Sequence, residues 1–152
     1  MADFWEWLGN TELAFQIGAT WWFPLFESIH VLFVVTLVGS IAIADLRALG
    51  LTGLGYHSAE FVRGLTRVAW ISFVPAVVTG LGLFISRPGG YAENPAFQIK
   101  FSLLLLAGLN VWFYHRFERT GQAGRQKLCA VLSLGFWIGI VFSGRWVGHI
   151  SG

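Results

Sequence analysis

Residues Pro24–Arg47 read PLFESIHVLFVVTLVGSIAIADLR, and the stretch 28–44 within them carries no formal charge. At about 1.5 Å per residue, a helix of this length crosses a hydrocarbon core about 30 Å thick. We therefore predict a membrane-spanning helix over 24–47. A helix that only anchors a chain in the membrane does not need polar groups, yet this stretch has Glu27 and His30 near one end and Asp45 at the other. Ionisable residues inside a span mark candidate functional sites.

The composition of the whole chain is that of a membrane protein. Of its 152 residues 55% are hydrophobic, the mean hydropathy is +0.65, and only 12% are charged, against about 25% in soluble domains. We therefore predict a single integral membrane domain over 1–152. A net charge of +2 gives no reason to expect a nucleic-acid partner. The single cysteine, Cys129, excludes an intrachain disulfide and a cysteine metal cluster.

Three further apolar segments follow, at about 67–86, 96–115 and 128–147. Each is long enough to span a bilayer, and short polar connections join them. Four such spans predict an all-α, antiparallel four-helix bundle embedded in the membrane. The segment 3–18 is too polar to span, and its tryptophans predict short amphipathic turns that lie in the membrane interface. A tight turn is expected at 91–95, just before the third span.

Basic residues are distributed unequally between the two faces of this bundle. One face, which carries the connections after the first and third spans, has seven, and the other has three. Because basic loops stay in the cytoplasm, we expect both termini outside, which is the periplasm for a protein of a bacterial inner membrane. The seven are Arg47, Arg63, Arg67, Arg116, Arg119, Arg125 and Lys127, and the three are Arg87, Lys100 and Arg145.

Four histidines lie near the ends of the predicted spans, two at each face. His30 and His149 belong to the periplasmic end, and His57 and His115 belong to the cytoplasmic end. Two imidazoles near each face are what a two-haem b-type cytochrome requires, because haem iron takes axial ligands from facing helices. Haem b held by histidine is one cofactor hypothesis, with His30 and His115 as the preferred ligands. The alternative is that these histidines are polar anchors in the interface.

A structural polar cluster is the alternative hypothesis for the periplasmic end. Glu27 and His30 are three residues apart, so they share one helix face. The bases expected at the same depth are Lys100 and Arg145. A buried carboxylate needs a basic partner, so we expect Glu27 to pair with one of these two bases. An E-x-x-H pair also occurs in di-iron bundles, but such a site needs further carboxylates, and the other spans contain none.

The cytoplasmic end of the first span carries the sequence Asp45-x-Arg47. One interpretation is a helix terminus that marks the cytoplasmic side. The other is a contact site for a quinone head group or an anionic lipid, in which Asp45 and Arg47 act with Arg67, Arg116 or Arg119. The sequence contains no nucleophile elbow, phosphate-binding loop, C-x-x-C or H-E-x-x-H motif. We therefore predict no catalytic residue and favour a role other than that of an enzyme.

Four motifs extend over nearly the whole chain. They are W-F-P-L-x-E-S-I-H at Trp22–His30, D-L-R-A-L-G at Asp45–Gly50, N-P-A-F-x-x-K at Asn94–Lys100 and S-G-R-W at Ser143–Trp146. Taken together they resemble a family of small bacterial four-helix membrane proteins of unknown function. The resemblance implies the fold and the membrane location, but no activity. The family pattern S-G-R-W-x-x-Y has a tyrosine where this chain has His149, which argues against a ligand role for His149.

Three functions remain open from the sequence. The first is an electron carrier that binds haem b and exchanges electrons with the quinone pool. The second is a non-catalytic subunit or assembly partner of a larger membrane complex or homo-oligomer. The third is a permease for a small ion or metal, which requires a polar path through the membrane midplane. The midplane residues available for such a path are Thr36, Ser40, Thr79, Asn110 and Ser133.

Overall fold

The computed structural model describes residues 2–51 and 59–150, and these residues form seven helices and no strand. They are α1 (Ala2–Gly9), α2 (Glu12–Ala19), α3 (Trp22–Ala48), α4 (Ala59–Ser86), α5 (Pro88–Glu93), α6 (Pro95–Arg119) and α7 (Ala123–Ile150). Four of them, α3, α4, α6 and α7, are long and apolar enough to cross a membrane. The prediction of an all-α helical bundle is confirmed.

The spanning helices are longer than the apolar segments that predicted them. The largest difference at a single end is in α4, which begins at Ala59 rather than near Arg67. Hydropathy detects only the apolar part of a helix, whereas the backbone hydrogen bonds continue into its polar ends. The region 91–95 also differs from the expected tight turn, because Pro88–Glu93 form the short helix α5. A proline at the first helical position favours this start, since its φ is already helical.

Local sequence explains where several helices begin and end. Asn94 caps α6, because its Oδ1 accepts hydrogen bonds from the backbone N–H groups of Ala96 at 2.9 Å and Phe97 at 3.4 Å. Gly50 and Gly121 follow α3 and α6 with φ values of +76° and +67°. Glycine adopts this left-handed conformation without strain, so both helices end where a glycine permits the turn.

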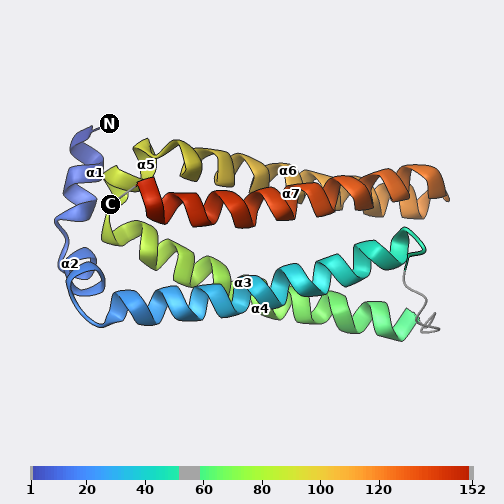
Figure 1. Ribbon diagram of the computed structural model, residues 1–152, viewed down its shortest axis with the longest axis horizontal. Coiled ribbons are helices and arrows are strands. Elements are labelled where there is room, and N and C mark those ends of the chain that lie inside the picture. The colour runs from blue at the N-terminus through green and yellow to red at the C-terminus, as the bar shows by residue number, and fades with distance from the viewer. Residues whose placement is uncertain (1, 52–58, 151–152) are drawn as a thin grey trace.

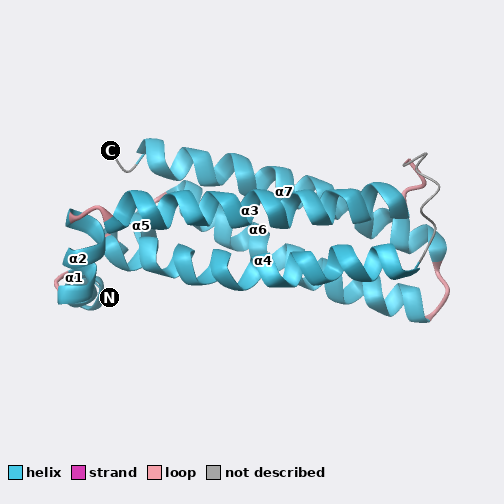
Figure 2. Cartoon of the chain, turned by 90° about the horizontal axis from the view of Figure 1, so that it is seen from below, coloured by secondary structure: helices cyan, strands magenta, loops and turns pink. Residues whose placement is uncertain are grey.

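The four long helices form two antiparallel hairpins, α3 with α4 and α6 with α7 (Figure 1). The hairpins meet mainly where α3 packs against α7, a contact that we call the seam. Both termini lie at one end of the bundle, which we call the terminal end (Figure 1). The short helices α1 and α2 lie across this end, with α2 packed on α4 and α3 and α1 packed on α5 (Figures 1 and 2).

A small apolar core closes the seam at mid-height. Its buried members are Leu37 from α3, Ala107 from α6, and Trp137 and Ile140 from α7. Small residues let α6 and α7 approach, since a Cβ on Gly139 would lie 2.9 Å from Cδ1 of Leu103. Large apolar side chains are exposed on all four long helices. Such an outer surface fits contact with a lipid bilayer and not with water.

Buried polar side chains hold neighbouring helices together or bond within their own helix. The Nδ2 atom of Asn110 on α6 donates to the carbonyl oxygen of Cys129 on α7 at 2.9 Å, and that of Asn94 donates to Val147 at 3.2 Å. The hydroxyl group of Ser40 donates to the carbonyl oxygen of its own helix one turn back. Each of these hydrogen bonds satisfies a polar group inside the bundle.

Candidate functional site

Of the three histidines that the structure describes, only His30 is partly buried. It lies about two turns into α3 and reaches α4, where its Nδ1 is 2.9 Å from the carbonyl oxygen of Ala76 and 3.1 Å from Oγ1 of Thr79. A carbonyl oxygen only accepts, so Nδ1 carries the hydrogen and donates it. Nε2 of the neutral ring is then an acceptor, and it has no hydrogen-bond partner among the described residues.

The segment of α4 that follows Pro75 is shaped to receive this ring. The hydroxyl group of Thr79 donates to the carbonyl oxygen of Pro75 at 2.7 Å, which leaves an oxygen lone pair for the hydrogen on Nδ1 of His30. Gly80 lies against the ring, since a Cβ there would be only 3.0 Å from Cε1 of His30. Glycine at this position therefore lets the His30 ring lie against α4, whereas a larger residue would push the ring away.

Lys100 on α6 adds a positive charge to the same region. Its side chain runs along Gly144 of α7, where a Cβ would lie 3.7 Å from Nζ, and its ammonium group acts electrostatically on His30. Within the described ranges, no carboxylate lies at salt-bridge distance from Lys100. All four long helices thus contribute to what we call the His30–Lys100 site. It consists of His30, Thr79, Gly80, Lys100 and Gly144.

Glu27 and Arg145, which the sequence places in this cluster, lie outside it. Both side chains are exposed, and the described residues contain no ion pair from Glu27 to Lys100 or Arg145. The predicted ion pair is not formed in the structure. Glu27 precedes His30 by almost one turn toward the terminal end, and an exposed carboxylate is solvated without a basic partner. Lys100 therefore reaches the interior without the carboxylate that was expected beside it.

Glu27 acts instead on Tyr91 of α5. Burial raises the pKa of the Tyr91 phenol, the nearby Glu27 carboxylate also raises this pKa, and the Arg87 guanidinium lowers it. The Tyr91 ring lies 6.0 Å from the Phe97 ring and 6.3 Å from the Phe84 ring, between centroids. These aromatic contacts join α4, α5 and α6 and close the terminal end of the bundle.

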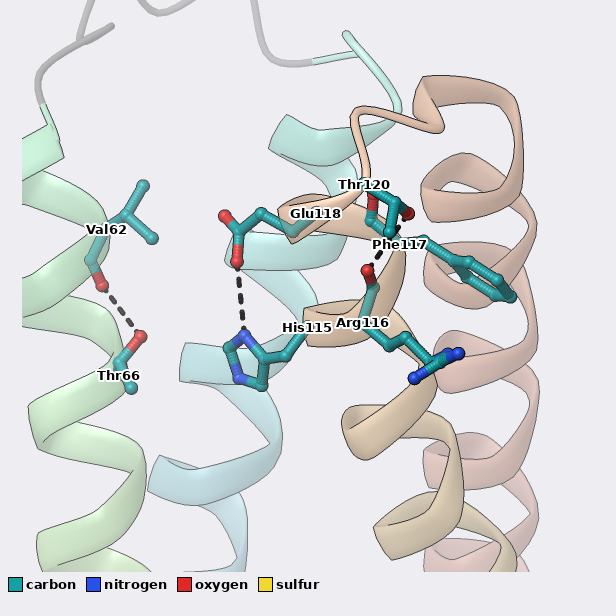
Figure 3. Close-up of polar contacts among 7 residues, drawn as sticks. All are labelled: Val62, Thr66, His115, Arg116, Phe117, Glu118 and Thr120. Atoms are coloured by element: carbon teal, nitrogen blue, oxygen red, sulfur yellow. Dashed lines mark hydrogen bonds and ion pairs between the residues drawn. The ribbon is translucent and has the colours of Figure 1, made fainter.

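The other predicted haem ligands are not brought to His30. His115 lies near the opposite end of the bundle, where its Nδ1 is 3.2 Å from Oε2 of Glu118 and both side chains are more than half exposed (Figure 3). His149 is exposed near the end of α7, with its ring 5.8 Å from the Trp146 ring. His57 lies outside the described residues. No two of the described histidines therefore face each other. A haem site here would have His30 as its histidine ligand.

Asp45 lies far from this site, in the part of the seam near the opposite end. It is only 9% exposed and faces α7, where the Ser133 hydroxyl group is its hydrogen-bonding neighbour. Arg67 is exposed on α4, and no ion pair joins it to Asp45 within the described residues. Arg47 follows Asp45 by two residues, which is about 200° around a helix, so the two side chains leave on different sides. The contact site for a quinone head group or an anionic lipid that was expected here stays a prediction.

The residues that complete the His30–Lys100 site were not predicted from the sequence. Thr79, Gly80 and Gly144 are common residue types in membrane helices, so they carry no signal by themselves. Pro75 inside α4 is unusual, but a proline removes the hydrogen bond to the carbonyl group four residues before it, at Ile71, and so does not predict a contact at Ala76. Where the structure describes the chain, no three His, Cys, Asp or Glu residues lie close enough together to hold a metal ion.

No protein-family model, curated protein or solved structure matches this chain. The resemblance to a family of small bacterial four-helix membrane proteins therefore stays a prediction.

Proposed function

We propose that this chain is a membrane protein of quinone-linked electron transport that binds a quinone head group at the His30–Lys100 site. The proposal is carried by the Lys100 side chain, which lies between α6 and α7 with no carboxylate partner in the described residues and acts on a neighbouring imidazole. A cation in the interior of a membrane protein is costly unless a partner or ligand compensates it. A ligand with polarised oxygen atoms supplies that compensation.

Both polar groups of the site suit a quinone head group. The ammonium group of Lys100 donates a hydrogen bond to a quinone carbonyl, and Nε2 of His30 accepts the hydroxyl hydrogen of a quinol. The bond from Nδ1 of His30 to Ala76 holds the ring in one orientation, as a second bond commonly does for a functional histidine. The apolar tail of a quinone then lies along the exposed apolar side chains of the spanning helices.

The distribution of basic residues supports a location in a bacterial inner membrane with both termini in the periplasm. The terminal end carries Arg87, Lys100 and Arg145, whereas the other seven basic residues belong to the opposite end. In this orientation the His30–Lys100 site lies in the periplasmic half of the bilayer. Quinones move within the bilayer, so a site between spanning helices is open to them from the side.

The proposal is tested by titrating the purified full chain, in lipid nanodiscs, with a short-tailed benzoquinone. Quinones quench tryptophan emission, and the chain has eight tryptophans. We expect saturable quenching in the natural protein. The variant Lys100→Met keeps the length of the side chain but removes its charge, and we expect it to bind about tenfold more weakly, or worse. We expect His30→Ala to weaken quinone binding as well.

Arg145→Met is the matched control, because it removes an exposed basic residue from the same end of the bundle. It should bind the quinone as the natural protein does. Quenching that rises linearly without saturation, or that is identical in Lys100→Met, would show that the quinone only partitions into the lipid. The role of a non-catalytic subunit would then take precedence, and chains that co-purify in mild detergent would identify its partner.

A b-type haem protein is a second candidate, favoured by Nε2 of His30, which has no hydrogen-bond partner in the described ranges. Metal-bound histidines usually donate their other ring hydrogen to a fixed acceptor, as Nδ1 does here to Ala76. The ammonium group of Lys100 could then form an ion pair with a haem propionate. The visible spectrum of protein expressed with ample haem decides this candidate: a Soret band that His30→Ala removes supports it, and a colourless protein rejects it.

A further inference from the structure

A cavity lies at the terminal end of the bundle, where the short helices α1 and α2 meet the end of α4 (Figures 1 and 2). Its volume is about 410 Å³, within the range of about 300–1,000 Å³ that is usual for small-molecule sites in proteins. Exposed side chains form part of its wall, so it opens to the outside of the bundle. The residues that line it include Asn10, Thr11, Glu12, Phe15, Ser86 and Arg87.

Two close glycine contacts hold the walls of this cavity in place. Gly18 of α2 lies against α4, since a Cβ there would be 3.3 Å from the carbonyl oxygen of Ser86. Gly9 of α1 lies against α5, since a Cβ there would be 3.4 Å from Cδ of Pro88. Small residues permit such close approach between helices. The turn between α1 and α2 is therefore packed against the rest of the bundle on both sides of the cavity.

The cavity has one acidic and one basic side chain that do not pair with each other. Glu12 comes from the first turn of α2, and Arg87 comes from the connection between α4 and α5. The described residues contain no ion pair between the two, and they give the Arg87 guanidinium no hydrogen-bond partner. Oε1 of Glu12 accepts a hydrogen bond from Nε2 of Gln16 at 3.0 Å, and Oε2 has no such partner in that part of the chain. A ligand that carries separate positive and negative groups would satisfy both side chains.

We propose that this cavity binds the head group of a phospholipid with a primary amine, of the phosphatidylethanolamine type. The guanidinium group of Arg87 donates hydrogen bonds to the phosphate, and the carboxylate of Glu12 accepts a hydrogen bond from the ammonium group. A quaternary amine such as choline is usually recognised by a cage of aromatic rings. Phe15 is the one aromatic side chain among the lining residues that the structure describes, so the cavity suits a primary amine better.

The position of the cavity fits a lipid better than a soluble ligand. It lies beside Ser86, where the long apolar helix α4 ends, and the end of a spanning helix is at the level of the lipid head groups. Large aromatic side chains of α1 and α2, such as Trp7, are exposed at the same end, as is typical of a membrane interface. Phe15 is 65% exposed and lines the cavity, so it offers apolar surface to the first part of an acyl chain.

The test measures the melting temperature of the full chain in mild detergent while short-chain lipids are added. Phosphatidylethanolamine, phosphatidylcholine and phosphatidylglycerol with identical acyl chains are compared. We expect a saturable rise, on the order of 3 °C, whose midpoint for phosphatidylethanolamine is about tenfold lower than for the other two lipids. Glu12→Gln should raise this midpoint to that of phosphatidylglycerol, because a neutral amide does not pair with the ammonium group. Arg87→Gln should weaken the binding of phosphatidylethanolamine by about tenfold, because the phosphate loses its charged donor.

Glu93→Gln and Arg145→Gln are the matched controls. Each removes an exposed charge of the same sign from the terminal end, outside the residues that line the cavity. Both should keep the natural response to phosphatidylethanolamine. Native mass spectrometry of the natural protein, mixed with equal amounts of the three lipids, needs no variant and keeps the test decisive if Arg87→Gln does not fold. It should show phosphatidylethanolamine retained in preference to the other two lipids.

The proposal is overturned if the three lipids act at the same concentration, or if Glu12→Gln and Arg87→Gln respond as their controls do. It is also overturned if water-soluble phosphoethanolamine stabilises the protein at the same concentration as the lipid, because the ligand would then be a soluble compound. Lys100→Met should leave the response to lipid unchanged, so failure of the quinone proposal would be recognised separately.

Discussion

Nδ1 of His30 lies 2.9 Å from the carbonyl oxygen of Ala76, and this contact links α3 to the part of α4 that follows Pro75. It fixes the rotation of α3 about its axis at this level, because an imidazole that donates to α4 cannot also face the lipid. Glu27, about one turn away, is then left on an exposed surface. The link also leaves Nε2 as the ring nitrogen available to a ligand.

Gly80→Ala is expected to disturb this contact directly. The added Cβ would lie 3.0 Å from Cε1 of His30, so the ring would have to shift by a few tenths of an ångström, which strains its bond to Ala76. We expect a loss of roughly 1 kcal/mol in stability and weaker quinone binding. Thermal unfolding in detergent measures the first effect, and fluorescence quenching measures the second.

Gly108→Ala is the control for this substitution, because nothing lies within 4 Å of a Cβ at that position. It should be neutral or slightly stabilising, since alanine favours a helix over glycine by up to about 1 kcal/mol. If Gly80→Ala and Gly108→Ala unfold at the same temperature, the ring of His30 does not depend on the glycine, and the site must be looser than the structure shows.

Asn110→Leu is expected to weaken the α6–α7 hairpin. The substitution removes the 2.9 Å hydrogen bond from Asn110 to the carbonyl oxygen of Cys129 but keeps a side chain of similar size. Hydrogen bonds between membrane helices contribute about 0.6–2 kcal/mol, so we expect a loss of that order in the free energy of unfolding. Ser102→Ala removes an exposed hydroxyl group that bonds only within α6, and it should leave the unfolding temperature unchanged.

The four spanning helices were predictable because their signal is local and strong. Each depends on a run of apolar residues, such as 28–44 in α3, and no tertiary contact is needed to recognise it. His30 and Lys100 were also recognisable, since ionisable residues are rare inside spans. Their partners were not, because the rotation of each helix is set by packing. A three-residue spacing put Glu27 near His30 on α3 but did not say that His30 turns to α4.

Asp45 shows the same limit at the other end of the chain. Its position two residues before Arg47 suggested a charged helix end, and simple proximity suggested partners such as Arg67. Only the packing of α3 on α7 shows that Asp45 faces Ser133 and is removed from water. The sequence identifies such a residue as unusual, and the tertiary structure decides its partner.

Tyr91 is expected to ionise at a higher pH than an ordinary tyrosine. Its pKa is raised chiefly by burial, with Arg87 lowering it and Glu27 raising it. The neutral phenol is thus favoured in the folded state, so its stabilising effect is complete below pH 10 and is lost as the pH rises through the raised pKa. An absorbance titration of the phenolate should show a lower Tyr91 pKa in Glu27→Gln and a higher one in Arg87→Gln; Tyr91→Phe assigns the signal.

The orientation of the bundle gives the last prediction. Seven basic residues belong to the end opposite the termini and three to the terminal end, so the positive-inside rule places both termini in the periplasm. A reporter that is active only in the cytoplasm should therefore be silent when fused after Gly152, and one that is active only in the periplasm should give a signal. A cytoplasmic reporter inserted in the polar connection after α6, at Gly121, should be active and serves as the matched control. Activity of the cytoplasmic reporter at Gly152 would reverse the orientation, and the His30–Lys100 site would then lie in the cytoplasmic half of the bilayer.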